Sequence, residues 1–171
     1  MLRQQELVTK YNVDLLWVDG YGFPYGNYGK EVFRTLFNHS LKRHGKIDAV
    51  GIAKVEDEPM LVKDIEAGVA ESILPYPWDG IFTFTHWFYK KDNPSMHNAR
   101  TIIELLCDIV SKNGNMLLNV ELKGDGTIPE EHKEILDSIG EWMKINKEAI
   151  YASKPWSVYG CLLYTSDAAD D

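Results

Sequence analysis

The sequence predicts an α/β fold built on a parallel β-sheet, and two observations support this fold class. Residues 13–20 read Val-Asp-Leu-Leu-Trp-Val-Asp-Gly, a short apolar run typical of a strand that is covered on both faces. Further short apolar runs then alternate with segments of helical spacing, an order that favours parallel strands joined by right-handed crossovers. A chain of 171 residues fits one domain of ordinary size.

We expect five strands, each a short apolar or β-branched run that ends at polar or small residues. They cover residues 13–18, 47–52, 81–85, 115–120 and 148–152. Between the second and third of these, residues 53–78 form a long, acidic and irregular segment. Loops of that length in compact domains are usually functional or disordered. The sequence therefore predicts a large loop here.

Helices are expected before the first strand and in three later segments. The first ends near Tyr11, and the second covers residues 30–44, where the apolar side chains repeat with helical spacing. Ser95 is the expected N-cap of a third helix that runs to Gly114. Pro129 is expected at the first position of a fourth helix that ends near residue 146.

Composition excludes several classes of partner. The formal net charge is -8 and no basic cluster occurs, so a nucleic-acid partner is not expected. No apolar run approaches the roughly 18 residues that cross a bilayer, so no membrane partner is expected either. The cysteines, histidines and acidic residues show no metal-ligand spacing, and we assign no metal.

Asp19 is the first candidate functional residue. It ends the first expected strand, and α/β folds place their chemistry at the carboxyl ends of parallel strands. Gly20 lets the backbone turn sharply beside the carboxylate. The plain alternative is that Asp19 only caps a turn, as Asp-Gly pairs often do.

Several motifs together carry a resemblance to a known family. The longest are the run from Asp108 to Pro129 and the run from Glu148 to Trp156. The shorter ones are Leu16-Trp-Val-Asp-Gly20, Ile65-Glu-Ala-Gly68, Pro77-Trp-Asp79, His86-Trp-Phe-Tyr89 and Ile139-Gly-Glu-Trp142. Over about residues 5–160 the sequence resembles the C-terminal half of the catalytic domain of α-L-fucosidases, the retaining glycoside hydrolases of family 29.

This resemblance implies an incomplete (β/α)₈ barrel, TIM-like, with roughly strands 4 to 8 of the catalytic domain. Such barrels typically need about 250 residues, so we expect residues 1–160 to be a partial catalytic barrel and the chain to be truncated. Residues 161–171 do not continue the family pattern. They resemble the translation of a library adaptor, and we expect a non-family tail there.

The activity implied is release of terminal α-L-fucose from fucosylated glycans with retention, without a cofactor, through a covalent fucosyl-aspartate. Retaining glycosidases use two carboxyl groups about 5–5.5 Å apart. The family nucleophile ends the fourth barrel strand, a position that matches Asp19. Two alternatives stay open: a truncated, catalytically inactive remnant with at most weak sugar binding, and a glycosidase with another sugar specificity.

The acid/base residue is left open by the sequence. Glu66 matches the glutamate of the family's Glu-Arg-Gly pattern, although the arginine is Ala67 here. Asp79 matches a position where other members place a catalytic glutamate, and Glu71 is a further loop acid. Glu66 is our first expectation and Asp79 the second. The alternative for Glu66 is a solvated loop charge.

Four more side chains are assigned to the substrate site by the resemblance: Trp17, Lys54, His86 and Trp87. Lys54 falls where many members carry an arginine, and a cation there could keep the nucleophile ionised. A solvated lysine is the alternative. Trp87 matches a sugar-lining tryptophan, with core packing as its alternative. His86 stands where members commonly have serine.

Overall fold

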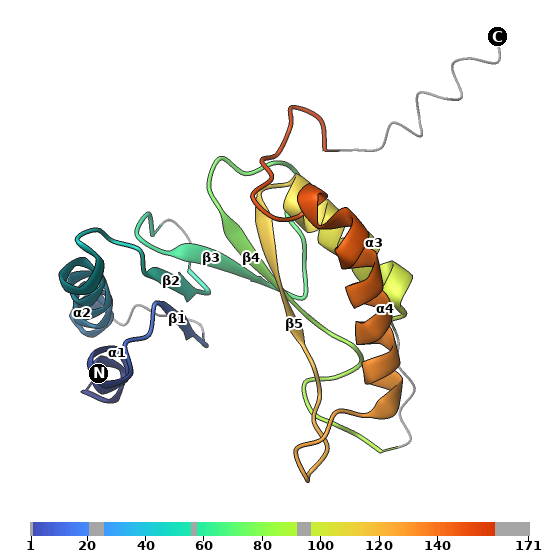
Figure 1. Ribbon diagram of the computed structural model, residues 1–171. Helices are drawn as coiled ribbons and strands as arrows, with labels where there is room; N and C mark the ends of the chain where they lie inside the picture. Colours follow the sequence, from blue (N-terminus) through green and yellow to red (C-terminus); the bar gives the residue numbers. More distant parts are fainter. Residues whose placement is uncertain (1, 21–25, 56–57, 92–96, 160–171) are drawn as a thin grey trace. The chain divides into compact units, whose positions relative to one another are not determined.

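A computed structural model describes residues 2–20, 26–55, 58–91 and 97–159 of the protein (Figure 1). The expected tail at residues 161–171 lies outside the described residues. The chain divides into two compact units. The first combines Met1–Ala67 with Tyr76–Ile81, and the second combines Gly68–Pro75 with Phe82–Asp171.

The first unit is a parallel sheet with two helices. Its elements are α1 (Leu2–Tyr11), β1 (Leu15–Val18), α2 (Gly26–His44), β2 (Val50–Ala53), β3 (Val62–Glu66) and the first part of β4 (Trp78–Thr83). β1 pairs with β2, β2 with β3 and β3 with β4, each time in parallel. The predicted parallel sheet is thereby confirmed for these strands.

The hydrophobic core of the first unit lies between the sheet and its helices. Val8 of α1 and Phe33 and Leu36 of α2 are almost completely buried, together with Ala53 of β2. Leu16 and Val18 of β1 pack against this cluster. In Figure 1, α1 and α2 lie side by side next to β1 and β2. Because side chains alternate along a strand, the neighbours of Leu16 and Val18 point to the opposite face of the sheet.

The second unit contains α3 (Ala99–Ser111), β5 (Gly114–Asn119), α4 (Glu130–Asn146) and the short 3₁₀ helix η1 (Lys147–Ala149). α3 packs against both β5 and α4, and Figure 1 shows the two helices side by side. Within the first unit the strands follow one another in the sheet in chain order, from β1 to β4. No helix within the described ranges is long and apolar enough to cross a bilayer.

One expected loop and one expected strand are wrong. Residues 53–78 are not one irregular loop, because β3 lies within them. Three of its five residues, Lys63, Asp64 and Glu66, are charged, which hides the strand from a search for apolar alternation. Residues 148–152 form no strand. The N–H groups of Ile150 and Tyr151 both donate to the carbonyl of Lys147, so the chain continues the helical winding of α4 there.

The helix starts also differ from expectation by a few residues. Asn98, not Ser95, caps α3, because its side-chain oxygen accepts the N–H of Thr101 at 2.9 Å. An Asn or Ser cap is equally favourable, so local sequence could not separate these two positions. Pro129 precedes the first residue of α4 with φ of -54° and ψ of 141°.

Gly51 of β2 gives a first prediction. A Cβ atom at this position would lie 2.5 Å from Cε1 of Phe33 and 2.8 Å from Cδ2 of Leu61. We expect Gly51→Ala to lower the free energy of unfolding by about 1–3 kcal/mol, since overpacking forces both neighbours to move. Chemical denaturation would measure the change. Gly140→Ala in α4 is the matched control: its Cβ would meet no atom within 4 Å, and we expect a gain of about 0.5–1 kcal/mol. Equal stabilities for the two variants would contradict the packing argument.

Candidate active site

The candidate site is built on the face of the first unit's sheet that points away from α1 and α2. Leu16 and Val18 face the core, so Trp17 and Asp19 take the other side. In the register of the sheet, Trp17 is paired with Ile52, and Ile52 is paired with Val62. Asp64 is paired with Asp79. Parallel register and alternation therefore bring six chemically active side chains to one face: Trp17, Asp19, Lys54, Asp64, Glu66 and Asp79.

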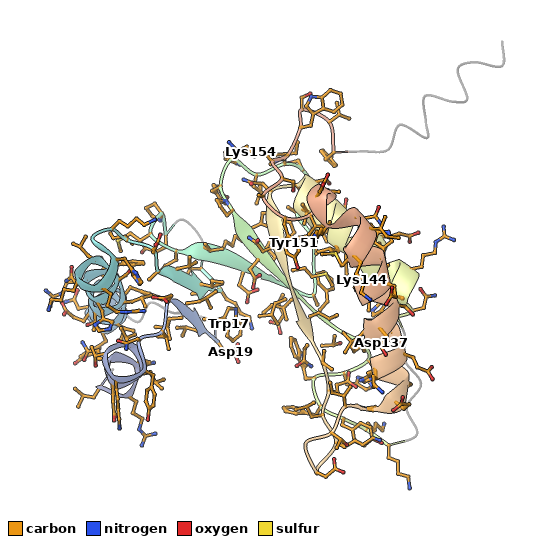
Figure 2. All side chains as sticks on the ribbon, in the orientation of Figure 1. Trp17, Asp19, Asp137, Lys144, Tyr151 and Lys154 are labelled. Carbon is orange, nitrogen blue, oxygen red and sulfur yellow. The ribbon has the colours of Figure 1, made fainter. Side chains whose placement is uncertain are left out.

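Lys54 joins two of the predicted catalytic carboxylates. Its Nζ lies 2.8 Å from Oδ1 of Asp19 and 3.0 Å from Oε2 of Glu66. The lysine side chain is only 8% exposed, and its ammonium also lies over the ring of Trp17, 5.5 Å from the centroid. The expected alternative of a solvated loop lysine does not describe this residue. Figure 2 labels Trp17 and Asp19 at the carboxyl end of β1.

The two bridged carboxylates are close enough to act on one bond. Oδ1 of Asp19 and Oε2 of Glu66 cannot be further apart than the sum of their distances to Nζ, about 5.8 Å. A separation of about 5–5.5 Å is typical of retaining glycosidases, and inverting enzymes need roughly 6.5–9.5 Å. The upper bound on the distance between Oδ1 of Asp19 and Oε2 of Glu66 lies below the range of inverting enzymes.

Hydrogen bonds favour the ionised form of Asp19. The hydrogen bond from Lys54 is the largest cause that lowers the pKa of this carboxyl, and the N–H of Gly20, at 2.8 Å from Oδ1, adds to it. Gly20 takes a φ of 98°, a left-handed conformation that glycine adopts without strain. The bond to Asp19 in turn raises the pKa of Lys54 above its ordinary value, so the lysine stays charged. The Asp19 side chain is 72% exposed and therefore accessible to a substrate.

Glu66 ends a strand rather than sitting in a loop, which corrects the expected location. It is the last residue of β3, and Ala67 directly after it takes a φ of 48°. That left-handed turn redirects the chain at once, as the strand-end turn after Asp19 does. Both carboxylates thus emerge from the same edge of the parallel sheet. Glu71, the third candidate acid, is exposed and outside the regular elements.

Asp79 occupies a different environment from Asp19 and Glu66. It lies inside β4, level with Asp64 of β3, and both aspartates are only 5% exposed. Within the described part of the chain, neither carboxylate oxygen of Asp64 has a hydrogen-bond partner, nor does Oδ2 of Asp79. Burial, with the charge of Asp64 as a second cause, raises the pKa of Asp79 to about 6. Burial also raises the pKa of Asp64.

Asp64 was not singled out from the sequence. The signal that could have found it is its position two residues before Glu66, which places both on the same face once β3 is recognised as a strand. The described residues contain no group of three or more His, Cys, Asp or Glu side chains that could hold a metal ion.

His86 and Trp87 belong to the second unit. Both are exposed, and they line a pocket of about 680 Å³ together with neighbours that include Thr83, Thr85 and Tyr89. Trp87 is 46% exposed, so the alternative of plain core packing does not describe it. An exposed indole face beside hydroxyl groups is suited to a sugar ring, whose C–H face is apolar and whose edges are polar.

Comparison with known proteins gives one consistent family. The sequence model described as alpha-L-fucosidase matches residues 1–148. The tissue alpha-L-fucosidase of Bos taurus is 47% identical over 162 residues, a match that covers 90% of this chain and 34% of the relative. The plasma alpha-L-fucosidase of Rattus norvegicus is 31% identical over 160 residues, covering 88% and 35%. The chain spans about a third of the length of the curated relatives it matches.

Solved structures agree with these matches. One alpha-L-fucosidase structure superposes with a TM-score of 0.76 at 31% identity, covering 91% of this chain and 35% of that one. The alpha-fucosidase of Thermotoga maritima in complex with fucose gives a TM-score of 0.73 at 33% identity, with coverage of 91% and 35%. The predicted fold class, an incomplete TIM-like barrel, is confirmed by this likeness.

Asp79 gives a prediction about pH. Its pKa of about 6 lies above the ordinary value of about 3.8, so the folded protein retains the proton longer and stability falls as pH rises through this interval. Asp79→Asn removes that cost. Relative to the unchanged protein, we expect its free energy of unfolding to gain up to about 3 kcal/mol between pH 4 and pH 7.5. Denaturation at both pH values measures this difference. Asp137→Asn, at an exposed position of α4 (Figure 2), is the control and should show no such gain.

Lys54 gives a second prediction, which needs no enzymatic assay. Lys54→Met removes the main hydrogen bond that holds the pKa of Asp19 low. We expect that pKa to rise toward the ordinary value of 3.8, while the N–H of Gly20 keeps it slightly lower. Carbon-13 NMR titration of the Asp19 carboxyl measures the change. Lys46→Met removes an exposed lysine that pairs with Asp48, and it should leave the titration of Asp19 unchanged. An Asp19 pKa that does not respond to Lys54→Met would disprove the bridge.

Proposed function

Because the chain belongs to the alpha-L-fucosidase family, we propose that it acts as a retaining glycoside hydrolase that releases terminal α-L-fucose from fucosylated glycans. The observation that carries this proposal is the bridge of Lys54 between Asp19 and Glu66. It holds one oxygen of each carboxylate within about 5.8 Å of the other at the same end of the sheet, which supports a retaining mechanism. Hydrolysis by this route needs no cofactor.

Asp19 is the proposed nucleophile. It is exposed, and its low pKa keeps it ionised at neutral pH, as an attacking carboxylate must be. Its oxygen attacks the anomeric carbon of fucose while the bond from that carbon to the leaving-group oxygen breaks. The product of this step is a fucosyl ester of Asp19. Ester formation removes one of the two carboxylate charges that Lys54 contacts in the free protein.

Glu66 is the proposed acid/base. The protonated form of Glu66 acts in the first step, where it gives its proton to the departing oxygen, and the carboxylate so formed takes a proton in the second step from the water that attacks the ester. Attack by water from the opposite side then releases fucose in its starting α configuration.

Asp79 is the second candidate for the acid/base. Its pKa of about 6 would keep part of its population protonated near neutral pH, which is a property that a general acid needs. Against this role, the residue is 5% exposed and lies inside a strand rather than at its end. We therefore assign proton transfer to Glu66 and a structural role to Asp79.

Fucose is the proposed sugar. The Thermotoga maritima relative was solved in complex with fucose, and another structure of the same protein holds a mechanism-based inhibitor. In this chain Trp17 and Trp87 are the aromatic side chains that we assign to contacts with the sugar ring. Trp17 also lies against the ammonium of Lys54, which pairs with the two carboxylates.

The stereochemistry of hydrolysis tests the reaction class. With an aryl α-L-fucoside as substrate, proton NMR should detect the α anomer of free fucose first, before mutarotation. First appearance of the β anomer would exclude a retaining mechanism. Absence of any Asp19-dependent turnover would instead favour the catalytically inactive alternative.

Azide rescue assigns the two carboxyl groups. Asp19→Ala should reduce kcat by several orders of magnitude, and added azide should give the β-fucosyl azide, because azide enters from the face that Asp19 vacates. Glu66→Ala should keep most activity toward substrates with a good leaving group, and azide should then give the α-fucosyl azide. Asp79→Ala is the matched comparison. If Asp79→Ala rather than Glu66→Ala yields the α-fucosyl azide, the acid/base assignment moves to Asp79.

A further inference from the structure

Glu121 is a buried acid that the proposed reaction does not use. It follows the end of β5 by two residues and is only 3% exposed. Burying a carboxylate costs free energy unless donors compensate for the lost water. Here the donors are the N–H of Thr85 at 3.0 Å, the hydroxyl of Thr85 at 2.8 Å and the N–H of His86 at 2.8 Å from Oε1.

These donors show how Glu121 shapes the chain after β4. In a strand, successive N–H groups point in opposite directions, so one oxygen cannot accept two consecutive ones. The N–H groups of Thr85 and His86 both reach Oε1 of Glu121. The backbone therefore leaves its extended conformation here and forms a small concave anion site. The carboxylate of Glu121 fills that site and fixes the turn.

Two further side chains, Asn119 and His132, contact the same region. The side-chain amide of Asn119 donates to the carbonyl oxygen of Trp87 at 3.2 Å. His132 of α4 is 2% exposed, with its Nε2 3.6 Å from Oε2 of Glu121 and its ring tilted against that of Phe84 at a centroid distance of 4.7 Å. Asn119 at the end of β5 thus holds the segment 85–87 directly, and His132 of α4 supports it through Glu121.

We infer that Glu121 is a positioning residue that holds the segment 85–87 so that Trp87 presents its indole face to the pocket. Glu121 is buried and touches the segment through backbone and hydroxyl groups rather than through the indole. The inference that the pocket receives fucose rests on the proposed function. The inference that Glu121 sets the conformation of the segment stands on the hydrogen bonds alone.

Amide hydrogen exchange of the full chain, followed by NMR, tests the conformational part. Glu121→Leu leaves two buried N–H groups without an acceptor, whereas Glu121→Gln keeps one carboxamide oxygen for both. In the leucine variant we expect exchange at Thr85 and His86 to accelerate at least about tenfold, with near-unchanged rates in the glutamine variant. If the leucine variant does not fold, Thr85→Val removes the hydroxyl donor and should accelerate exchange at His86 about threefold. Unchanged exchange at both amides would overturn the inference.

A double-mutant cycle tests the functional part. With an aryl α-L-fucoside, Glu121→Leu should raise KM about tenfold when Trp87 is present, and less than about twofold in a Trp87→Ala background. A general loss of stability would lower the apparent kcat through the folded fraction, and an equal rise of KM in both backgrounds would overturn the positioning role. If the unchanged protein does not hydrolyse the fucoside, the proposed function fails, while the exchange rates still decide whether Glu121 fixes the segment.

Discussion

A single lysine ammonium holds the candidate site together. β2 lies between β1 and β3 in the sheet, so the residue that follows it can reach the ends of both neighbours. Lys54 does this with one bond to each side. A nearly buried ammonium is unfavourable without a negative partner. Two carboxylates within about 6 Å repel each other when no cation lies between them. Each charge therefore depends on the other two, and the distance between Asp19 and Glu66 is limited because both carboxylates contact the same ammonium.

The sheet of the first unit has two chemically opposite faces. Leu16 and Val18 join the apolar cluster formed with α1 and α2, which supplies the hydrophobic stabilisation of the unit. The opposite face holds the lysine and four acids, two of which, Asp64 and Asp79, are buried without full hydrogen bonding. The fold thus accepts a local cost in stability on the face where its chemistry lies, as functional sites often do.

Sequence alone predicted the parts of this structure that depend on local pattern. The place of Asp19 directly after a strand was predictable because an apolar run stops at it, and the helices were predictable from their spacing. β3 was missed because its inward residues, Asp64 and Glu66, are charged, and alternation is usually recognised by apolar residues. The Lys54 bridge joins residues 35 positions apart and Glu121 meets Thr85 across 36, so both needed three-dimensional register.

The charged face of β3 also has a consequence for how the chain finds its pairing. A slip of β3 by one residue would turn Asp64 and Glu66 toward the apolar side and bring Lys63 and Ile65 to the site. The slipped pairing would bury two acids among hydrocarbon side chains without the lysine that compensates them. Misaligned strands are therefore unstable from the moment they form. The acidic residues of β3 therefore also disfavour a shifted register, because the correct alignment of the sheet is the more stable one.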